Sequence, residues 1–208
     1  RRSAEDLDHV VGAYRLLPGS RAAEFGRFYC DAEYDLTPLR QSGRSLLELG
    51  RSCVDPDYRG GSGMFLLWNA LADYVLDLGI EVLFGVASFH GTDPAELAPS
   101  LSWLHHNHLA PLGLRPRARA AGFQPMDLIP PERLDRREAL VSMPALIKAY
   151  LRLGGLVGRW VRIGRRLTLG MAMGRWVSWA RRRRLSVGGT MRLSRLKALA
   201  EEAAAAAE

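Results

Sequence analysis

An α/β domain is the fold class that the sequence predicts, and three features predict it. Residues 45–54 form a strand-like apolar run that stops at Asp55-Pro56-Asp57, where the proline prevents the strand from continuing. A glycine-rich turn then leads into residues 64–78, whose apolar side chains recur at helical spacing. Residues 80–87 (IEVLFGVA) are almost wholly apolar, as in a buried strand. Strand, turn, helix and strand in this order make a βαβ-like unit.

Further elements are expected on both sides of this unit. The segment before it predicts a strand that ends at a Pro-Gly-Ser turn, and the segment after it predicts two helices, the first capped by Asp93. Two segments are ambiguous, since one fits either strand or helix and the other looks like a connection. The strand is expected at 9–17, the helices at 94–109 and 144–153, the ambiguous segment at 25–29, the connection at 34–39 and an irregular segment at 112–131.

The 208 residues suffice for one domain with a sizeable core. The net charge of +7 is unevenly distributed: residues 1–138 hold 15 Lys and Arg against 19 Asp and Glu, whereas residues 139–200 hold 14 Lys and Arg and no acid. We therefore predict a mildly acidic body followed by a basic tail. Such a tail suits an anionic membrane, an acidic protein or nucleic acid.

The chain contains neither a long apolar stretch nor a signal-peptide core, so we expect a cytoplasmic protein. Two cysteines, Cys30 and Cys53, are too few for a disulfide framework. They are expected to be reduced cysteines of the core.

The turn at 59–63 has the composition of a phosphate cradle. Its glycines allow a close backbone approach, and the helix after it offers free N–H groups and a favourable dipole. Arg59 adds a charged donor. A purely structural turn is the alternative, since neither a dinucleotide fingerprint nor a Walker A loop is present.

Glu48 lies inside an apolar strand, where a carboxylate is costly unless it has partners. A buried Glu suits a general base that acts directly or through water. A solvent-facing position or an ion pair with Arg51 is the alternative.

Three histidines at 105, 106 and 108 suggest a metal site. Zinc needs three or four ligands, and no Cys or carboxylate stands at useful spacing. We therefore predict no metal and expect histidines that cap and pack.

Several motifs occur together in one order: the strand segment 47–61, and segments 11–17, 84–94, 104–111 and 144–155. Together they resemble the bacterial ornithine-lipid N-acyltransferases, a branch of the GNAT superfamily. The resemblance covers residues 10–158. The Glu-x-x-Arg pair of Glu48 and Arg51 is also similar to a strand of autoinducer synthases.

The resemblance implies a GNAT-like mixed β-sheet flanked by helices. It implies that the donor binds at Arg59, Gly60, Gly61, Ser62, Gly63 and Met64. The donor would be acyl-phosphopantetheine on acyl carrier protein, or acyl-CoA, with no tightly bound cofactor. The acceptor would be the α-amine of ornithine and the product lyso-ornithine lipid.

This resemblance makes Glu48 and Arg51 the catalytic candidates, with Glu48 as proton acceptor. Backbone N–H groups near Cys53 and Val54 would polarise the thioester carbonyl. Cys53 as a nucleophile is the alternative. The arginines at 115, 117 and 119 are candidates for carrier docking, or belong to a solvated loop.

The chain departs from the family pattern at three places. Ser62 and Met64 stand where the usual GNAT turn has Gly, and the segment before Val10 is short for the first elements of the fold. After Gly158 the resemblance ends. We therefore predict a GNAT-like domain at 1–158, truncated at its start, and a basic, partly helical or disordered tail at 159–208.

That tail has two interpretations: an amphipathic segment in peripheral contact with an anionic membrane, or a frame-shifted ending that removes the last strand. Two other functions remain open. One is acyl transfer to a different amino acid, such as glutamine or lysine. The other is a non-catalytic basic module that binds membrane or nucleic acid, although no nucleic-acid motif supports it.

Overall fold

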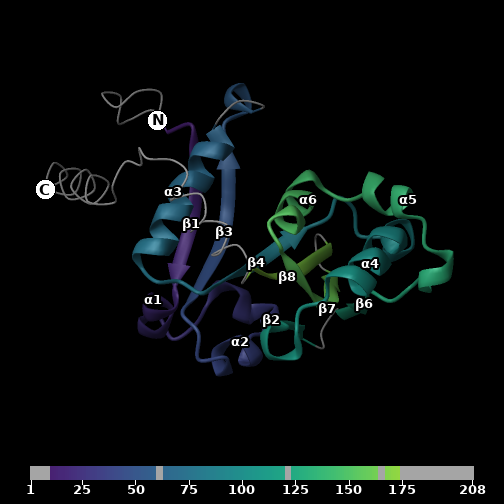
Figure 1. The fold of residues 1–208 in the computed structure, drawn as a ribbon, viewed down its shortest axis with the longest axis horizontal. Helices are drawn as coiled ribbons and strands as arrows, with labels where there is room; N and C mark the ends of the chain where they lie inside the picture. The colour runs from purple at the N-terminus through teal and green to yellow at the C-terminus, as the bar shows by residue number, and fades with distance from the viewer. Residues whose placement is uncertain (1–9, 60–62, 120–122, 164–166, 174–208) are drawn as a thin grey trace, which may run out of the picture. The chain divides into compact units, whose positions relative to one another are not determined.

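A computed structural model describes residues 10–59, 63–119, 123–163 and 167–173 (Figure 1). The chain divides into two compact units. The described part of the smaller unit comprises residues 10–14, 51–59 and 63–80, and the larger unit contains residues 15–50 and the described residues from 81 onward.

The larger unit is built on a mixed β-sheet with the strand order β1-β3-β4-β8-β7-β6. Of β1 and β3, residues 15–18 and 46–50 belong to this unit. β3 and β4 run parallel, with Leu46 opposite Val82 and Leu49 opposite Gly85. Three further pairs, β4–β8, β8–β7 and β7–β6, are antiparallel. The strands are β1 (Gly12–Pro18), β3 (Leu46–Val54), β4 (Val82–Ser88), β6 (Phe123–Pro125), β7 (Leu156–Ile163) and β8 (Leu167–Met173).

β4 lies in the interior of this sheet, and its sequence explains why. Val82, Leu83 and Phe84 are all buried, as expected of a strand covered on both faces. The ring of Phe84 meets that of Phe28 edge to face at 4.9 Å. Phe28 and Phe84 belong to one apolar cluster, whose other members are Ala22, Cys30, Tyr34, Leu36, Leu39, Leu46, Val82, Ala118 and Ala172.

Three helices accompany the antiparallel half of the sheet (Figure 1). They are α4 (Pro94–His108), α5 (Arg136–Val141) and α6 (Ala145–Arg152). Asp93 caps α4 as predicted, by accepting the Ala95 N–H at 2.8 Å. α4 packs against α5 and β7, and the buried Ser100 hydroxyl donates to the Ala139 carbonyl at 2.5 Å. Within the described residues, no helix is long and apolar enough to cross a membrane.

Short elements fill residues 19–41, where the sequence pattern was ambiguous. α1 (Gly19–Glu24) precedes a 3₁₀ helix (Tyr29–Ala32), so residues 25–29 do not form a strand. The expected connection at 34–39 holds β2 (Tyr34–Asp35), which pairs with β5 (Arg117–Ala118), and the start of α2 (Thr37–Gln41). Asp35 accepts the Thr37 N–H at 2.9 Å, so a side chain fixes this helix start.

The smaller unit contains the end of β3, a 3₁₀ helix (Pro56–Tyr58) and α3 (Gly63–Asp77). α3 confirms the helix predicted after the glycine-rich turn, and Leu71, Ala72 and Val75 form its buried face. Gly79, with φ of 61°, lies just beyond the helix end, where a left-handed conformation favours glycine.

Residues 159–173 differ from the basic tail that the sequence predicts. The expected boundary at 158 falls inside β7, and β8 lies between β4 and β7. Neither a helix nor a lost final strand describes this part of the chain. The buried residues of β8 are Leu167, Leu169, Gly170, Met171 and Ala172, an almost continuous buried run that the high arginine content around it obscured. The rest of the predicted tail, 174–208, lies outside the described residues.

Tyr34→Phe is expected to lower the free energy of unfolding by about 1–2 kcal/mol. The Tyr34 hydroxyl is part-buried and donates to the Thr168 carbonyl of β8 at 2.7 Å, and the ring packs against Gly170. Urea denaturation of both proteins measures the difference. An unchanged unfolding midpoint would mean that β8 does not occupy this place.

Candidate functional site

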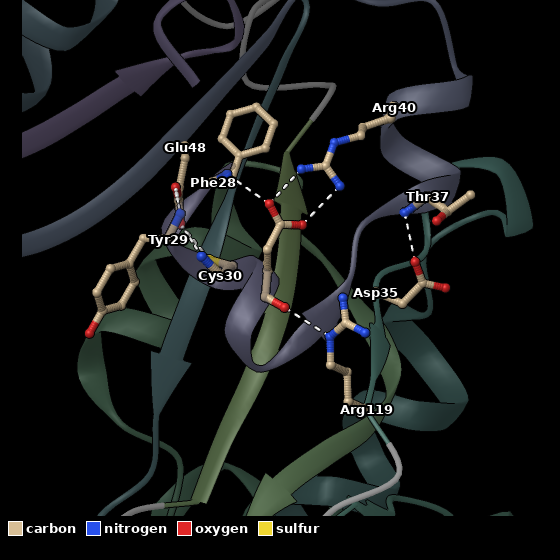
Figure 2. Close-up of polar contacts among 9 residues, drawn as sticks. Phe28, Tyr29, Cys30, Asp35, Thr37, Arg40, Glu48 and Arg119 are labelled. Carbon is tan, nitrogen blue, oxygen red and sulfur yellow. Dashed lines mark hydrogen bonds and ion pairs between the residues drawn. The ribbon is translucent and has the colours of Figure 1, made fainter. Parts of the chain in front are cut away.

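The carboxylate of Glu48 is buried and accepts hydrogen bonds from one short segment of the chain. Glu48 is 1% exposed. The Tyr29 N–H donates to Oε2 at 2.8 Å and the Cys30 N–H to Oε1 at 2.8 Å. The Cys30 thiol donates to Oε1 at 2.6 Å. Figure 2 shows the three donors gathered around this carboxylate. These hydrogen bonds offset the cost of burying the Glu48 carboxylate in an apolar strand.

This arrangement has a simple local cause. The first N–H groups of a helix lack internal acceptors, and the 3₁₀ helix at Tyr29–Ala32 begins where Glu48 of β3 faces it. Glu48 thus caps this helix from a strand that is distant in sequence. A carboxylate has about four acceptor positions, so one position, on Oε2, is left beyond the three bonds.

The same 3₁₀ helix is held from its other side. Asp31 accepts the Phe28 N–H at 2.7 Å and forms a bidentate pair with Arg40. The Arg119 Nε donates to the Asp31 carbonyl at 2.8 Å (Figure 2). The Tyr29–Ala32 segment is therefore fixed by β3, α2 and the chain after β5. Arg119, a candidate for carrier docking, thus has a structural role.

Cys30 is a buried thiol in this cluster. Burial, followed by the charge of Glu48 and the hydrogen bond to it, raises the pKa of the Cys30 thiol well above its usual range. The thiol therefore keeps its proton and acts as a donor, not as a nucleophile. Cys53, expected in the core, is exposed, so that prediction is wrong for Cys53; like Cys30, it is a free cysteine.

The remaining predicted residues lie in the smaller unit. Arg51 is exposed and has φ of 52°, a left-handed conformation that costs an arginine about 1–3 kcal/mol. Such strain concentrates at functional positions. Val54 accepts a hydrogen bond from the Arg59 Nε at its carbonyl, at 3.1 Å. Glu48 belongs to the larger unit and these residues belong to the smaller one.

The predicted donor turn is described only at its two ends. Asp55 accepts the Asp57 N–H at 3.0 Å and so starts the short 3₁₀ helix before the turn. Gly63 opens α3, and the Met64 sulfur contacts the Ser52 hydroxyl at 3.9 Å. Gly60, Gly61 and Ser62 lie outside the described residues. β3 ends before this segment and α3 begins after it, as the sequence predicts.

The histidines of α4 have a neighbour that sequence spacing did not reveal. Ligand atoms of His105, His106 and Asp127 lie within 4.8 Å of one another. The His106 Nε2, however, faces two acceptors: the Ile129 carbonyl at 3.0 Å and an Asp127 oxygen at 3.5 Å. This nitrogen therefore carries its proton and has no lone pair for a metal. That this place holds no metal stays a prediction.

The sequence did not predict the residues that bind Glu48 or hold the 3₁₀ helix against it. These are Tyr29, Cys30, Asp31, Arg40 and Arg119. The only signal in the sequence was the unexplained carboxylate inside an apolar strand. That signal requires partners but does not identify them, because they come from segments with no regular pattern.

Comparison with known proteins agrees with this architecture. Residues 2–69 match the family described as "Acetyltransferase (GNAT) domain". The L-ornithine N(alpha)-acyltransferase of Rhodobacter capsulatus is 72% identical over 161 residues, which cover 77% of this chain and 61% of that protein. The chain belongs to the GNAT superfamily. The L-ornithine N(alpha)-acyltransferase of Brucella abortus is 46% identical over 72% of this chain and 54% of its own length.

This GNAT chain spans between half and two thirds of the length of these curated relatives. A solved CoA-dependent acyl-homoserine lactone synthase, with SAM and isopentyl-CoA, is 14% identical and has a TM-score of 0.39 over 84% of this chain and 59% of that one.

Proposed function

We propose that this GNAT chain is an N-acyltransferase that moves an acyl group from a thioester carrier to the α-amine of L-ornithine. The observation that carries the proposal is the 72% identity over 161 residues to an L-ornithine N(alpha)-acyltransferase. At that identity, the residues that select the acceptor are expected to be shared within the matched segment. The acetyltransferase domain match supports an acyl thioester as the donor.

The finer proposal is a 3-hydroxyacyl group on acyl carrier protein as donor, with acyl-CoA as the alternative, and lyso-ornithine lipid as product. Both donors end in the same phosphopantetheine arm. The turn at 59–64 is proposed to hold its phosphate, because Arg59 is exposed before α3 and the first N–H groups of a helix lack internal acceptors and favour an anion. A lipid product fits a cytoplasmic enzyme that touches the membrane surface.

In the proposed reaction, the neutral amine attacks the thioester carbonyl and the carbon–sulfur bond breaks. The amine loses one proton and the leaving thiolate gains one, so the exchange balances. We assign the proton acceptor to Glu48 acting through a water on the remaining position of Oε2, because its other positions are occupied. Backbone N–H groups at Cys53 and Val54 are proposed to polarise the carbonyl oxygen, and the strained Arg51 to contact the substrates.

A thiol-release assay tests the proposal. Purified chain is mixed with 3-hydroxyacyl carrier protein or 3-hydroxyacyl-CoA, and with L-ornithine, L-lysine or L-glutamine. We expect thiol release that depends on L-ornithine and is faster with the carrier-protein donor. Release that depends on lysine or glutamine instead would replace the acceptor and keep the reaction class. No amine-dependent release with any donor would contradict the proposal.

A further inference from the structure

Arg15 of β1 carries a guanidinium group that lies beside the Glu48 cluster and takes no part in it. The central carbon of the guanidinium stands 4.4 Å from the centre of the Tyr29 ring. Tyr29 is the residue whose N–H donates to Glu48, and it is 49% exposed. The cation–π contact therefore places a positive charge at the edge between the buried cluster and the solvent.

Gly50 of β3 makes room for this guanidinium. A Cβ at position 50 would lie 2.5 Å from the terminal nitrogen of Arg15 and 3.2 Å from its Nε. The missing side chain at this strand position therefore leaves space for the guanidinium, and a methyl group there would move the end of the arginine aside. The backbone of β3 and the ring of Tyr29 together orient the planar group.

Among the described residues, no carboxylate pairs with Arg15 and no carbonyl accepts from it. The carboxylate of the cluster, Glu48, accepts from Tyr29 and Cys30. Arg15 still acts on this cluster through its charge, which opposes the rise in the pKa of Cys30. A half-buried guanidinium that is oriented by a ring and by backbone, with its donors unused, is suited to a planar bidentate anion.

We infer that Arg15 binds the α-carboxylate of the amino-acid acceptor, an inference that rests on the proposed function. An amino acid held in this way has its α-amine two bonds from the carboxylate carbon. Its side-chain amine lies several bonds further away. Binding through the carboxylate selects amino acids over simple amines. It also favours acylation at the α-nitrogen over a side-chain nitrogen.

The phosphate of the donor arm is a second anion that could use the same guanidinium. The acceptor carboxylate and the donor phosphate can be told apart by which substrate has its KM raised when Arg15 is replaced. If the acceptor carboxylate is the ligand, Arg15→Ala raises the KM for L-ornithine about 10- to 100-fold, the loss of one charge-assisted bidentate contact, and leaves the KM for the acyl donor unchanged.

The decisive experiment compares L-ornithine with L-ornithinamide, which lacks the carboxylate charge. We expect the kcat/KM of the wild-type chain to be about 10- to 100-fold higher for L-ornithine than for L-ornithinamide. Arg15→Ala should lose this preference, because its kcat/KM falls for L-ornithine and not for L-ornithinamide. Gly50→Ala is expected to do the same, since its methyl group displaces the guanidinium without removing it. Arg15→Lys should restore part of the preference. Arg44→Ala, an exposed arginine in the loop before β3, is the matched control and should change nothing.

The outcomes separate the inference from the proposed function. An unchanged preference for L-ornithine in Arg15→Ala overturns the inference and leaves the proposed function intact. A rise in the donor KM in its place assigns Arg15 to the phosphate and also overturns the inference. Transfer to another amino acid, with the same dependence on its carboxylate and on Arg15, overturns the ornithine assignment and supports the inference. Calorimetric titration of L-ornithine into folded wild type and Arg15→Ala gives a readout that does not require turnover, and equal affinities would overturn the inference.

Discussion

Replacing Glu48 with Gln is expected to lower the free energy of unfolding by about 3 kcal/mol and to abolish acyl transfer. The carboxylate receives three donors, two of them backbone N–H groups. A glutamine offers one oxygen and one NH₂ group, so at least one buried N–H would face another donor. Leaving a buried donor unsatisfied costs about 1–3 kcal/mol, and bonds to a charged acceptor are worth more than neutral ones. Urea unfolding and the thiol-release assay measure the two effects.

Glu24→Gln is the matched control. Glu24 pairs with Arg21 on the surface of α1, with both side chains more than half exposed, and exposed pairs contribute at most about 1 kcal/mol. We expect native stability and native activity for this variant. If Glu48→Gln is as stable as wild type, Glu48 does not hold the Tyr29–Ala32 helix.

The chemical role of Glu48 can be separated from its structural role at Cys30. Cys30→Ser keeps a donor to Oε1 and leaves the carboxylate charge in place. If transfer requires only the carboxylate, this variant remains active. If Glu48→Gln keeps its fold but loses transfer, the proton-acceptor role is supported. Retained transfer in Glu48→Gln would exclude that role.

Gly85→Ala is expected to lower the free energy of unfolding by about 3 kcal/mol. Gly85 pairs with Leu49 in the parallel β3–β4 ladder, and a Cβ there would collide with the backbone carbonyl of Leu49. Backbone cannot move aside as a side-chain end can, so the strands must separate locally, and overpacking of this kind costs about 1–3 kcal/mol or more. Denaturant midpoints measure the loss.

The ladder that Gly85→Ala disturbs includes the Glu48–Phe84 pair, so we also expect transfer to fall. Gly113→Ala is the control, because no heavy atom lies within 4 Å of a Cβ at that position and its φ is not left-handed. Equal stability of the two alanine variants would contradict the pairing of Gly85 with Leu49.

The sequence predicted most of the regular elements because their signals are local. β3 and β4 are apolar runs, α3 has apolar residues at helical spacing, and α4 begins at a cap signal. Each of these signals depends on a few neighbouring residues. The proline at 56 and the cap at Asp93 were enough to place two boundaries.

What was missed depends on contacts between distant segments. The 3₁₀ helix at Tyr29–Ala32 is held by Glu48, 18 or 19 positions later, and no local pattern records such a bond. β8 was hidden by its arginine-rich surroundings, although its residues from Leu167 to Ala172 are mostly buried. Arg15 and Gly50 are unremarkable in sequence, and only the paired strands show that one makes space for the other.

The measurement that tests the central claim most directly is tandem mass spectrometry of the product that the purified chain forms from L-ornithine and 3-hydroxyacyl carrier protein. We predict a single amide with the acyl group on the α-nitrogen, formed by wild type and absent with Glu48→Gln. An amide on the δ-nitrogen would contradict the acceptor geometry, and acyl ornithine formed equally well by Glu48→Gln would contradict the role of the buried carboxylate.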